Sequence, residues 1–456
     1  MPEIRKNAYA NIIKPPNQLY SKSQSLTAQS QAIVIGSGPA GLAAALRLQK
    51  HNKISCTIYE LRPEPTTLGG AIAIFSNGLR LFNRLGIYDD LMRCGYAGSM
   101  FTLHSLRGGV VGTQDFVGWA REKTGFGYLR IRRNDLVGVL LEAVKREGIE
   151  IKFGMKMKGI EELDGDVDVE GNGGGGVRVL FEDGSSDTAD LLLGCDGIHS
   201  QVRREVVDPL QEPEYSGIAG SFSLIPAAEL PAGSADSMAG LHAMLTEEGI
   251  FLINPCTPNK DVVMWSFSRE VALPTSGDIR DGWEEHRKAE VEGFKDNLLK
   301  ILEGSHGEWS ETVKNLVRKT TVIKFHPIYR LPLGGQWYKG RCLLLGDAGH
   351  AMSPHAGQGV SMALEDVFLL SRLLEDSNRS LPDVFAKFDY IRRPRVNEVY
   401  SHSAKNANSR KKTGPWGLWM KETAWGVYSG LSWAFGLDKK GAGQKHLAYD
   451  IDEAEL

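Results

Sequence analysis

Short apolar runs that end in glycine alternate along the chain with longer segments typical of helices. Continuous apolar residues at 32–35, 191–193 and 343–345 predict three buried strands. The first run leads through a glycine-rich turn into a predicted helix over 42–50, and the third leads into one over 360–374. This alternation predicts an α/β fold.

A second kind of pattern lies in the middle of the chain. The segments 250–254 and 261–267 are rich in β-branched and aromatic residues and predict strands of an antiparallel sheet. The acidic, glycine-rich segment 164–176 predicts a hairpin tip between two strands. We therefore expect a second, sheet-based unit beside the α/β part.

The turn after the first apolar run carries the spacing GxGxxG. Gly36 permits a tight turn, Gly38 lets the backbone approach a pyrophosphate, and Gly41 lets helix and strand pack closely. A second strand, Ser55–Tyr59, ends at Glu60, which lies 19 positions after Gly41 and can accept hydrogen bonds from a ribose. An acid at this place favours a ribose without a 2′-phosphate, as in FAD or NAD.

Two further strand ends carry an aspartate next to a glycine. Asp196-Gly197 follows the second apolar run, and Gly346-Asp347 follows the third. A carboxylate at a strand end can accept hydrogen bonds from sugar-like hydroxyls. Each aspartate taken alone could equally be a helix cap or a turn residue.

Three motifs together carry a family resemblance: GSGPAG (36–41), CDGIHSQVR (195–203) and GDAGHAMSPHAGQGVSMALED (346–366). In this order they resemble the FAD-dependent aromatic hydroxylases, the single-component flavoprotein monooxygenases typified by para-hydroxybenzoate and salicylate hydroxylase. Segments 68–87 and 132–143 are similar to further parts of that family. The family often has Asn where this chain has Ser361, and both side chains can hydrogen-bond.

The resemblance implies an FAD site assembled from distant segments. Glu60 would hold the adenosine ribose with Arg62 beside it, and Asp347 would bind the ribityl hydroxyls. Arg133 would contact the phosphate or ribityl region, and Asp196 would lie near the cofactor and the nicotinamide path. The flavin ring would lie beside Ala73, Pro354, Gly357, Gln358 and Gly359. The cofactor-binding set is completed by Gly36, Gly38, Ala40, Gly41 and Val360.

The implied fold is a Rossmann-like FAD-binding domain interleaved with an α+β substrate domain on an antiparallel sheet, with a C-terminal helical tail. We expect a flexible leader at 1–30, followed by a discontinuous FAD-binding domain at 31–210 and 336–400. The substrate domain would occupy 211–335, and a Trp-rich helical segment 401–456. Candidates to line the substrate pocket are Tyr215, His242, Trp265 and Tyr329, with ordinary packing as the alternative.

The implied reaction is an NAD(P)H- and O2-dependent monooxygenation. A flavin C4a-hydroperoxide would hydroxylate, or epoxidise, a small aromatic or polycyclic compound. No second GxGxxG follows a strand, so NAD(P)H would bind transiently as a co-substrate. A reductase or dehydrogenase on the same scaffold, and a non-catalytic FAD-binding protein, are the alternatives. No catalytic base can be assigned from the sequence.

The amino-acid composition narrows the classes of partner that we expect. Lys+Arg total 53 and Asp+Glu 56, so no basic excess suggests a nucleic-acid partner. The five cysteines lack a CxxC pair, and the glycine neighbours of His199, His350 and His355 make a metal site unexpected. The N-terminus has no signal-peptide pattern, and we expect a cytoplasmic protein. The arginines near 392–395 predict a solvated basic face.

The tail Pro415–Leu437 contains four of the nine tryptophans. Its length would span a bilayer, but Lys421 and Glu422 interrupt it. Three interpretations stay open: packing against the body, for instance over the substrate entrance; contact with a membrane interface; and a transmembrane helix.

Overall fold

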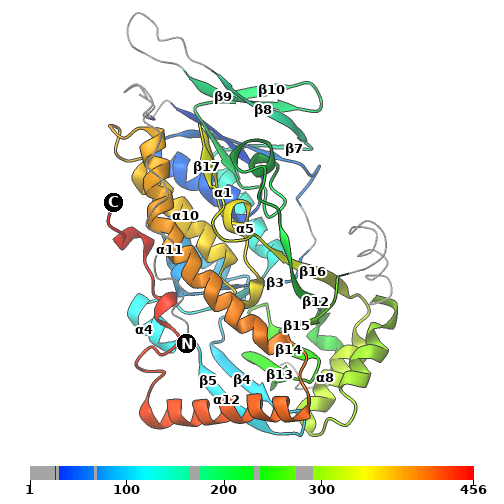
Figure 1. Ribbon diagram of the computed structural model, residues 1–456. Helices are drawn as coiled ribbons and strands as arrows, with labels where there is room; N and C mark the ends of the chain where they lie inside the picture. Colours follow the sequence, from blue (N-terminus) through cyan, green and yellow to red (C-terminus); the bar gives the residue numbers. More distant parts are fainter. Residues whose placement is uncertain (1–25, 27–29, 66–68, 164–174, 231–236, 274–290) are drawn as a thin grey trace, which may run out of the picture.

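The three apolar runs form adjacent parallel strands in a six-stranded sheet. The computed structural model describes residues 26, 30–65, 69–163, 175–230, 237–273 and 291–456 (Figure 1). The strand order is β17-β18-β11-β1-β2-β7. The bounds are β1 (Gln31–Ile35), β2 (Ser55–Glu60), β7 (Glu150–Phe153), β11 (Leu191–Gly194), β17 (Tyr338–Lys339) and β18 (Cys342–Leu344). In the register, Ile35 pairs with Gly194 and Gly194 with Leu344, so the three glycine-bearing turns leave the sheet side by side.

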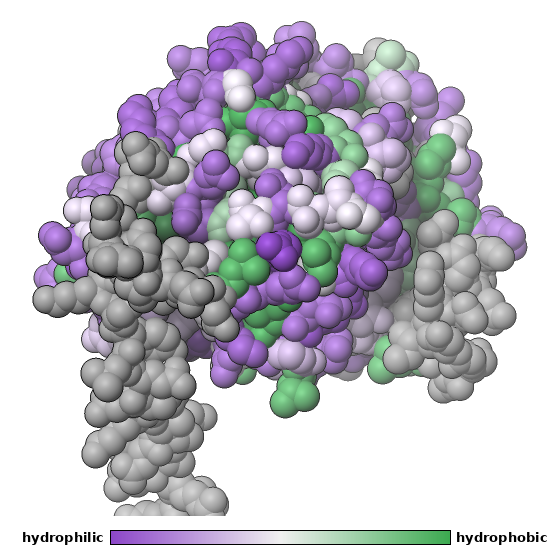
Figure 2. Space-filling model, turned by 90° about the horizontal axis from the view of Figure 1, so that it is seen from above, coloured by the Kyte–Doolittle hydropathy of each residue, from purple (hydrophilic) through white to green (hydrophobic). Residues whose placement is uncertain are grey.

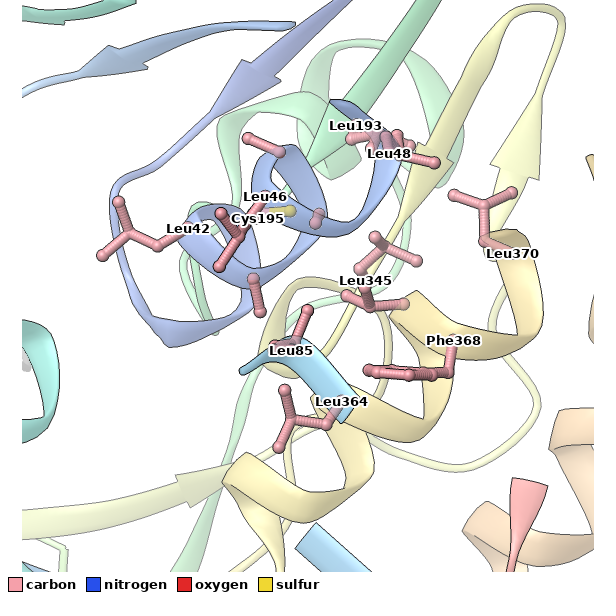
Figure 3. Packing of buried hydrophobic residues seen from close by; sticks show 14 of the residues in the cluster. Leu42, Leu46, Leu48, Leu85, Leu193, Cys195, Leu345, Leu364, Phe368 and Leu370 are labelled. Atoms are coloured by element: carbon pink, nitrogen blue, oxygen red, sulfur yellow. The ribbon is translucent and has the colours of Figure 1, made fainter. Parts of the chain in front are cut away.

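Four helices from separate parts of the chain pack on one another and on this sheet. The four helices at this core are α1 (Pro39–Arg47), α2 (Ser76–Leu85), α5 (Arg133–Arg146) and α10 (Gly359–Leu373). Figure 3 shows Leu42 and Leu46 of α1 gathered with Leu364 and Phe368 of α10, all of them buried. Helix α1 begins three residues earlier than predicted because Pro39 suits the first helical position, and it continues into a π-helical turn, Leu48–Asn52.

A seven-stranded sheet forms the second unit, in the order β16-β12-β15-β14-β13-β4-β5. Its strands are β4 (Met100–His104), β5 (Val110–Asp115), β12 (Glu214–Pro226), β13 (Leu241–Leu245), β14 (Gly249–Pro255), β15 (Val262–Glu270) and β16 (Lys324–Arg330). All neighbouring pairs are antiparallel except β13 with β4. Strands β4 and β5 join this sheet from the segment that the sequence placed with the FAD-binding domain. The α/β class and the antiparallel second sheet are confirmed.

The described chain also contains two small sheets and several short helices. A three-stranded sheet contains β8 (Met157–Leu163), β9 (Gly176–Phe181) and β10 (Ser186–Ala189), and a two-stranded one contains β3 (Ala71–Ile74) and β6 (Leu129–Arg132). The short helices are α3 (Tyr88–Met92), α4 (Gly118–Thr124), α8 (Glu308–Lys319) and α9 (Asp347–His350). Most of the predicted hairpin tip and of the leader lies outside the described residues.

Two long helices close the fold. Helix α11 (Leu381–Ala407) runs along the body, and α12 (Pro415–Phe435) crosses one end of the molecule, against β5 (Figure 1). After α12 the chain returns to the α/β part, where Asp450 pairs with Arg80 and Arg84 at 2.5 and 2.7 Å. Among the described helices, none combines the length and the apolar character needed to cross a bilayer.

A buried ionic network joins α10 to α11. Arg392 binds Glu365 at 2.7 Å and Asp366 at 2.8 Å, and all three side chains are fully buried. Arg395 adds a second contact to Glu365 at 3.2 Å. The prediction of a solvated basic face was therefore wrong for Arg392 and Arg395, because two acids in the middle of α10 draw these arginines into the core.

A pair of buried imidazoles connects β4 to β13. His104 Nε2 lies 2.9 Å from His242 Nδ1, and the ring of Trp309 stacks 4.1 Å from that of His104. Burial and the neighbouring His242 lower the pKa of His104 to about 4. Burial also lowers the pKa of His242. Both rings are therefore neutral at pH 7.

We expect the free energy of unfolding to fall as the pH drops from about 6.5 to about 4. Over that range an unfolded imidazole binds a proton and the folded one does not, so the unfolded state gains protons. The loss from His104 should be at least about 1 kcal/mol. Urea unfolding at pH 7 and pH 5 measures it. In the variant His104→Gln the slope should be shallower, and an unchanged slope would contradict the assignment.

Candidate functional site

One large cavity lies between the parallel sheet and the seven-stranded sheet. Its volume is about 670 Å³, within the usual range for small-molecule and cofactor sites. One side is lined by residues from the GxGxxG turn, β3, α5 and the 345–360 segment, together with Cys195 and Gly197 of the second motif. Residues of β12, β14, β15 and β16 line the other side. The cavity thus joins all three sequence motifs to the sheet of the second unit.

The glycine turn is shaped by close backbone contacts. Gly36 has φ +104°, and a Cβ there would lie 2.5 Å from the Cys195 carbonyl oxygen. A Cβ on Gly41 would lie 2.0 Å from the Gly36 oxygen. Gly38 lines the cavity, and a Cβ there would meet no protein atom within 4 Å. Gly36 and Gly41 are thus required by the fold, whereas Gly38 leaves open space for a ligand.

Alanine substitutions at Gly41 and at Gly38 should have different consequences, one for stability and the other for FAD binding. Gly41→Ala should destabilise the protein, because the clash is with backbone that cannot move freely. Gly38→Ala should leave the unfolding midpoint of the apoprotein nearly unchanged and weaken FAD binding by at least about tenfold, since its methyl group would fill the cofactor's place. Thermal unfolding and FAD titration measure the two effects. A Gly38→Ala variant with parental FAD affinity would contradict this placement.

Glu60 stands at the end of β2, next to the glycine turn. Its Oε2 accepts hydrogen bonds from the backbone nitrogen and from Oγ of Ser37, both at 2.8 Å, and its Oε1 accepts one from the Arg62 nitrogen at 3.0 Å. Neither Glu60 nor Arg62 lines the cavity itself. The carboxylate is thus fixed at the rim of the turn.

Asp347 presents a carboxylate to the cavity. It lines the wall and has no hydrogen-bond partner among the described residues. Burial raises the pKa of the Asp347 carboxyl, while the positive charges of His350 and Arg133 act to lower it. Asp366 holds this turn in place by accepting hydrogen bonds from the Gly346 nitrogen at 2.8 Å and from His350 Nε2 at 2.7 Å. The buried network thereby positions an acceptor that is free for a ligand's hydroxyls.

The turn before α10 meets β3 at the cavity wall. Gly357 has φ +63°, and a Cβ there would lie 3.2 Å from the Cβ of Ala73. Two residues predicted to flank a flavin are therefore neighbours although 284 positions separate them. Gly359 begins α10, and the partial positive charge at this helix start faces the cavity.

Nine of the fifteen predicted cofactor residues line this single cavity. They are Gly38, Ala40, Ala73, Arg133, Asp347, Pro354, Gly357, Gly359 and Val360. Gly36 and Gly41 shape the turn, and Glu60 and Arg62 lie at its rim. Asp196 Oδ2 accepts bonds from the Gln201 and Val202 nitrogens at 2.6 and 3.3 Å, so this aspartate acts as a cap.

Gln358, like Asp196, does not line the cavity. Its Oε1 accepts a hydrogen bond from Asn77 Nδ2 at 3.0 Å, and its Nε2 is buried without a partner among the described residues. Asn77 also donates to Glu365 Oε1 at 2.8 Å. Gln358 is thus tied to the buried ionic network behind the turn.

The opposite wall contains residues that the sequence did not reveal. Met264, Ser266 and Ser268 of β15 point into the cavity together with Phe222 and Leu252. The predicted Trp265 lies on the other face of the strand, where its Nε1 donates to Thr320 Oγ1 at 2.8 Å. Successive strand residues alternate between faces, so the prediction selected the right strand and the wrong face.

The other three pocket candidates are also packed elsewhere. His242 pairs with His104, and the rings of Tyr215 and Tyr329 lie 5.6 Å apart. None of the three lines the cavity. Ordinary packing, the alternative interpretation, accounts for all of them.

Three basic side chains from different elements also line this cavity: Arg130, His326 and Arg410. Arg410 follows α11, and its Nη1 donates to the Asn406 oxygen at 2.6 Å and to Ser409 Oγ at 3.0 Å. Its Nε is buried without a partner, and no carboxylate of the described chain pairs with it. Burial lowers its pKa to about 10, so it remains charged at pH 7.

His355 reinforces this basic character. It lines the cavity, and its Nε2 is buried without a partner in the described chain. Burial, with Arg410 and His326 nearby, lowers its pKa to about 3. Burial also lowers the pKa of His326. The two imidazoles are therefore neutral hydrogen-bonding groups near the Arg410 guanidinium.

The remaining histidines of the motifs have structural contacts. His350 is paired with Asp366, and the ring of His199 lies 6.3 Å from that of Tyr329. In the described part of the chain, no group of three or more His, Cys, Asp or Glu side chains is arranged to hold a metal ion.

The residues present fit FAD. The open space at Gly38 accommodates a pyrophosphate against the start of α1, and Asp347 supplies the free acceptor that a ribityl chain requires. Gly357 and Ala73 line the cavity with small side chains, beside which a flat ring can lie. When bound, FAD supplies electron transfer and activation of oxygen.

Comparison with known proteins agrees with this assignment. A family model described as FAD binding domain matches residues 29–403. A 6-hydroxynicotinate 3-monooxygenase of Pseudomonas fluorescens is 28% identical over 89% of this chain and 94% of its own length. An FAD-dependent urate hydroxylase of Klebsiella pneumoniae is 28% identical over 83% and 90%.

The fold agrees as well. The crystal structure of Klebsiella pneumoniae HpxO complexed with FAD and uric acid superposes with a TM-score of 0.71 at 23% identity, covering 88% of this chain and 92% of the other. Because the family model extends over most of the chain and its motifs meet at one cavity, the protein belongs to the FAD-binding family that contains FAD-dependent aromatic monooxygenases.

Proposed function

We propose that this FAD-dependent monooxygenase hydroxylates an aromatic compound that carries a negative charge, using NAD(P)H and O2. The observation that supports the proposal most strongly is the unpaired Arg410 in the wall of the cavity that also contains the FAD motifs. A buried charge without a partner is unfavourable, and a ligand anion would offset that cost.

The cofactor would occupy the side of the cavity formed by the motifs. Gly38 and the start of α1 would receive the pyrophosphate, and Arg133 would lie beside it. Asp347 would accept hydrogen bonds from the ribityl hydroxyls, and Pro354 and Gly357 would border the ring. The residue roles of the wider set, including Glu60 at the adenosine ribose and Asp196 near the nicotinamide path, belong to this proposal.

The substrate would lie between the flavin and the seven-stranded sheet. Phe222, Leu252 and Met264 would contact its ring and keep water out of the site. Arg410 would bind a carboxylate or an enolate, and the neutral His355 would exchange a hydrogen bond with a ring hydroxyl or ring nitrogen. The names of the relatives describe aromatic substrates with acidic character, namely hydroxynicotinate, aminohydroxybenzoate and urate.

A substrate panel tests this proposal. Purified, flavin-containing protein is given hydroxylated aromatic carboxylic acids and the methyl ester of each one, and NAD(P)H loss is followed together with product mass. We expect several acids to accelerate NAD(P)H loss and gain one oxygen, and each ester to react more slowly. Faster oxidation with no oxygen gained by any substrate would favour the reductase alternative. Equal rates for acids and esters would contradict the anionic substrate.

A further inference from the structure

Helix α12 has a mixed inner side and a largely apolar outer side. The buried positions are Leu418, Glu422, Ser429 and Ser432, and Leu418 packs with Trp425 in a hydrophobic cluster that includes residues of β4, β5 and β13. Ser105 Oγ donates to Glu422 Oε2 at 3.0 Å, and Ser429 Oγ donates to the Thr113 oxygen at 3.2 Å. A helix on the surface of a globular protein normally has a polar outer side, so the apolar outer side of α12 is unusual.

The outward side of α12 carries a continuous apolar stripe, which we call the outer stripe. Trp416 is 79% exposed and Trp433 is 86% exposed. The outer stripe consists of Trp416, Trp419, Met420, Val427, Leu431, Trp433 and Phe435. Figure 1 shows α12 at the very end of the molecule, with no described element outside it. Such an exposed apolar patch indicates a site that another protein or a membrane covers.

The charges around the outer stripe indicate what kind of surface covers it. Exposed lysine pairs flank the helix at both ends, Lys411 and Lys412 before it and Lys439 and Lys440 after it. Of these, Lys412 also pairs with Glu248 at 2.6 Å. No charged residue lies between Glu422 and Asp438, and Glu422 is buried. The opposite end of the molecule has a largely hydrophilic surface with scattered apolar residues (Figure 2). Apolar and aromatic side chains between lysines are the pattern of a helix that lies in an anionic membrane surface.

A second copy of this chain fits the outer stripe less well. Two α12 helices that met through their stripes in parallel would place the first lysine pair of one against the first pair of the other. An antiparallel arrangement would place Lys411 and Lys412 against Lys439 and Lys440 of the other copy. Either arrangement brings like charges together at both ends, whereas anionic lipid headgroups neutralise them.

We propose that α12 docks this enzyme on the surface of membranes that contain anionic lipids, with the outer stripe in the interface and the lysines at the headgroups. The inference concerns binding alone and does not depend on the reaction in the cavity. The helix would lie parallel to the membrane and leave the α/β part in water.

Vesicle co-sedimentation of the full-length, flavin-containing protein tests the proposal. Vesicles contain phosphatidylcholine alone or phosphatidylcholine with about three-tenths phosphatidylserine. We expect binding to the anionic vesicles to be at least about tenfold tighter, and to weaken strongly in 0.5 M NaCl. Lys439→Gln with Lys440→Gln should weaken it roughly tenfold or more.

The double variant Trp416→Ser, Trp433→Ser should also lose at least about tenfold in vesicle affinity, because two indole rings leave the interface. Its flavin spectrum and unfolding midpoint should not change, since both side chains are exposed. The matched control is Leu210→Ser, at an apolar residue that is 93% exposed and does not belong to α12. Equal binding to both vesicle types, a double variant that binds like its parent, or a tryptophan-dependent dimer in light scattering without vesicle binding would overturn the proposal.

Discussion

Arg392→Met should lower the free energy of unfolding by about 3–5 kcal/mol, because it removes the cation at the centre of the buried ionic network. The substitution leaves the Glu365 and Asp366 carboxylates fully buried without the guanidinium that they share. Burial alone would raise the pKa of Glu365, and Arg395 and Arg392 together lower it, so the acid depends on these cations to remain charged. Chemical denaturation of the parent and the variant measures the loss.

The same variant should lose FAD even where it remains folded. Asp366 holds both the Gly346 nitrogen and His350, and these contacts fix the turn that presents Asp347. The matched control is Arg318→Met, whose guanidinium is half exposed and pairs with Glu311 at 3.8 Å. That control should change stability by less than about 1 kcal/mol. Similar losses in both variants would show that the buried network has no special role.

Arg410→Met should reduce kcat/KM for an anionic substrate by about 10- to 100-fold. A charge-assisted hydrogen bond in a dry cavity is lost, and the rest of the wall is unchanged. The rate with the corresponding methyl ester should change by less than about threefold, because the ester has no charge for the guanidinium to bind. Steady-state kinetics with an acid and its ester separates the two cases.

Stability provides an independent check on Arg410. The guanidinium is buried with no described carboxylate beside it, so methionine should leave the apoprotein as stable as the parent or slightly more stable. FAD content should not change. Lys412→Met, at an exposed residue two positions away, is the control and should alter neither kinetics nor stability appreciably. If Arg410→Met lowered the rates for acid and ester equally, the side chain would have another role.

The sequence predicted the α/β framework because its signals are local. A continuous apolar run next to glycine identifies a buried strand, and β1, β11 and β18 lie where 32–35, 191–193 and 343–345 predict them within one or two residues. The pairing of β4 with β13 could not be found in this way, because it joins residues about 140 positions apart through the backbone alone.

The two walls of the cavity also differ in how well the sequence predicts them. The cofactor wall depends on glycines and on Asp347, whose residue types are themselves the signal. The substrate wall depends on which face of β15 points inward, and the large aromatic Trp265 was a poor guide because it packs in the core while the smaller Ser266 faces the cavity. Arg410 gave no sequence signal, since a basic residue near Lys411 and Lys412 resembles a solvated cluster.

In the proposed reaction, one cavity holds FAD and an aromatic substrate together, so that oxygen passes from O2 to the substrate. Turnover under ¹⁸O2, with an acid from the panel and NAD(P)H, tests it most directly. We expect the product to carry one ¹⁸O atom, at one NAD(P)H consumed per product. Consumption of NAD(P)H with an unlabelled substrate, and all the label in hydrogen peroxide or water, would contradict the claim.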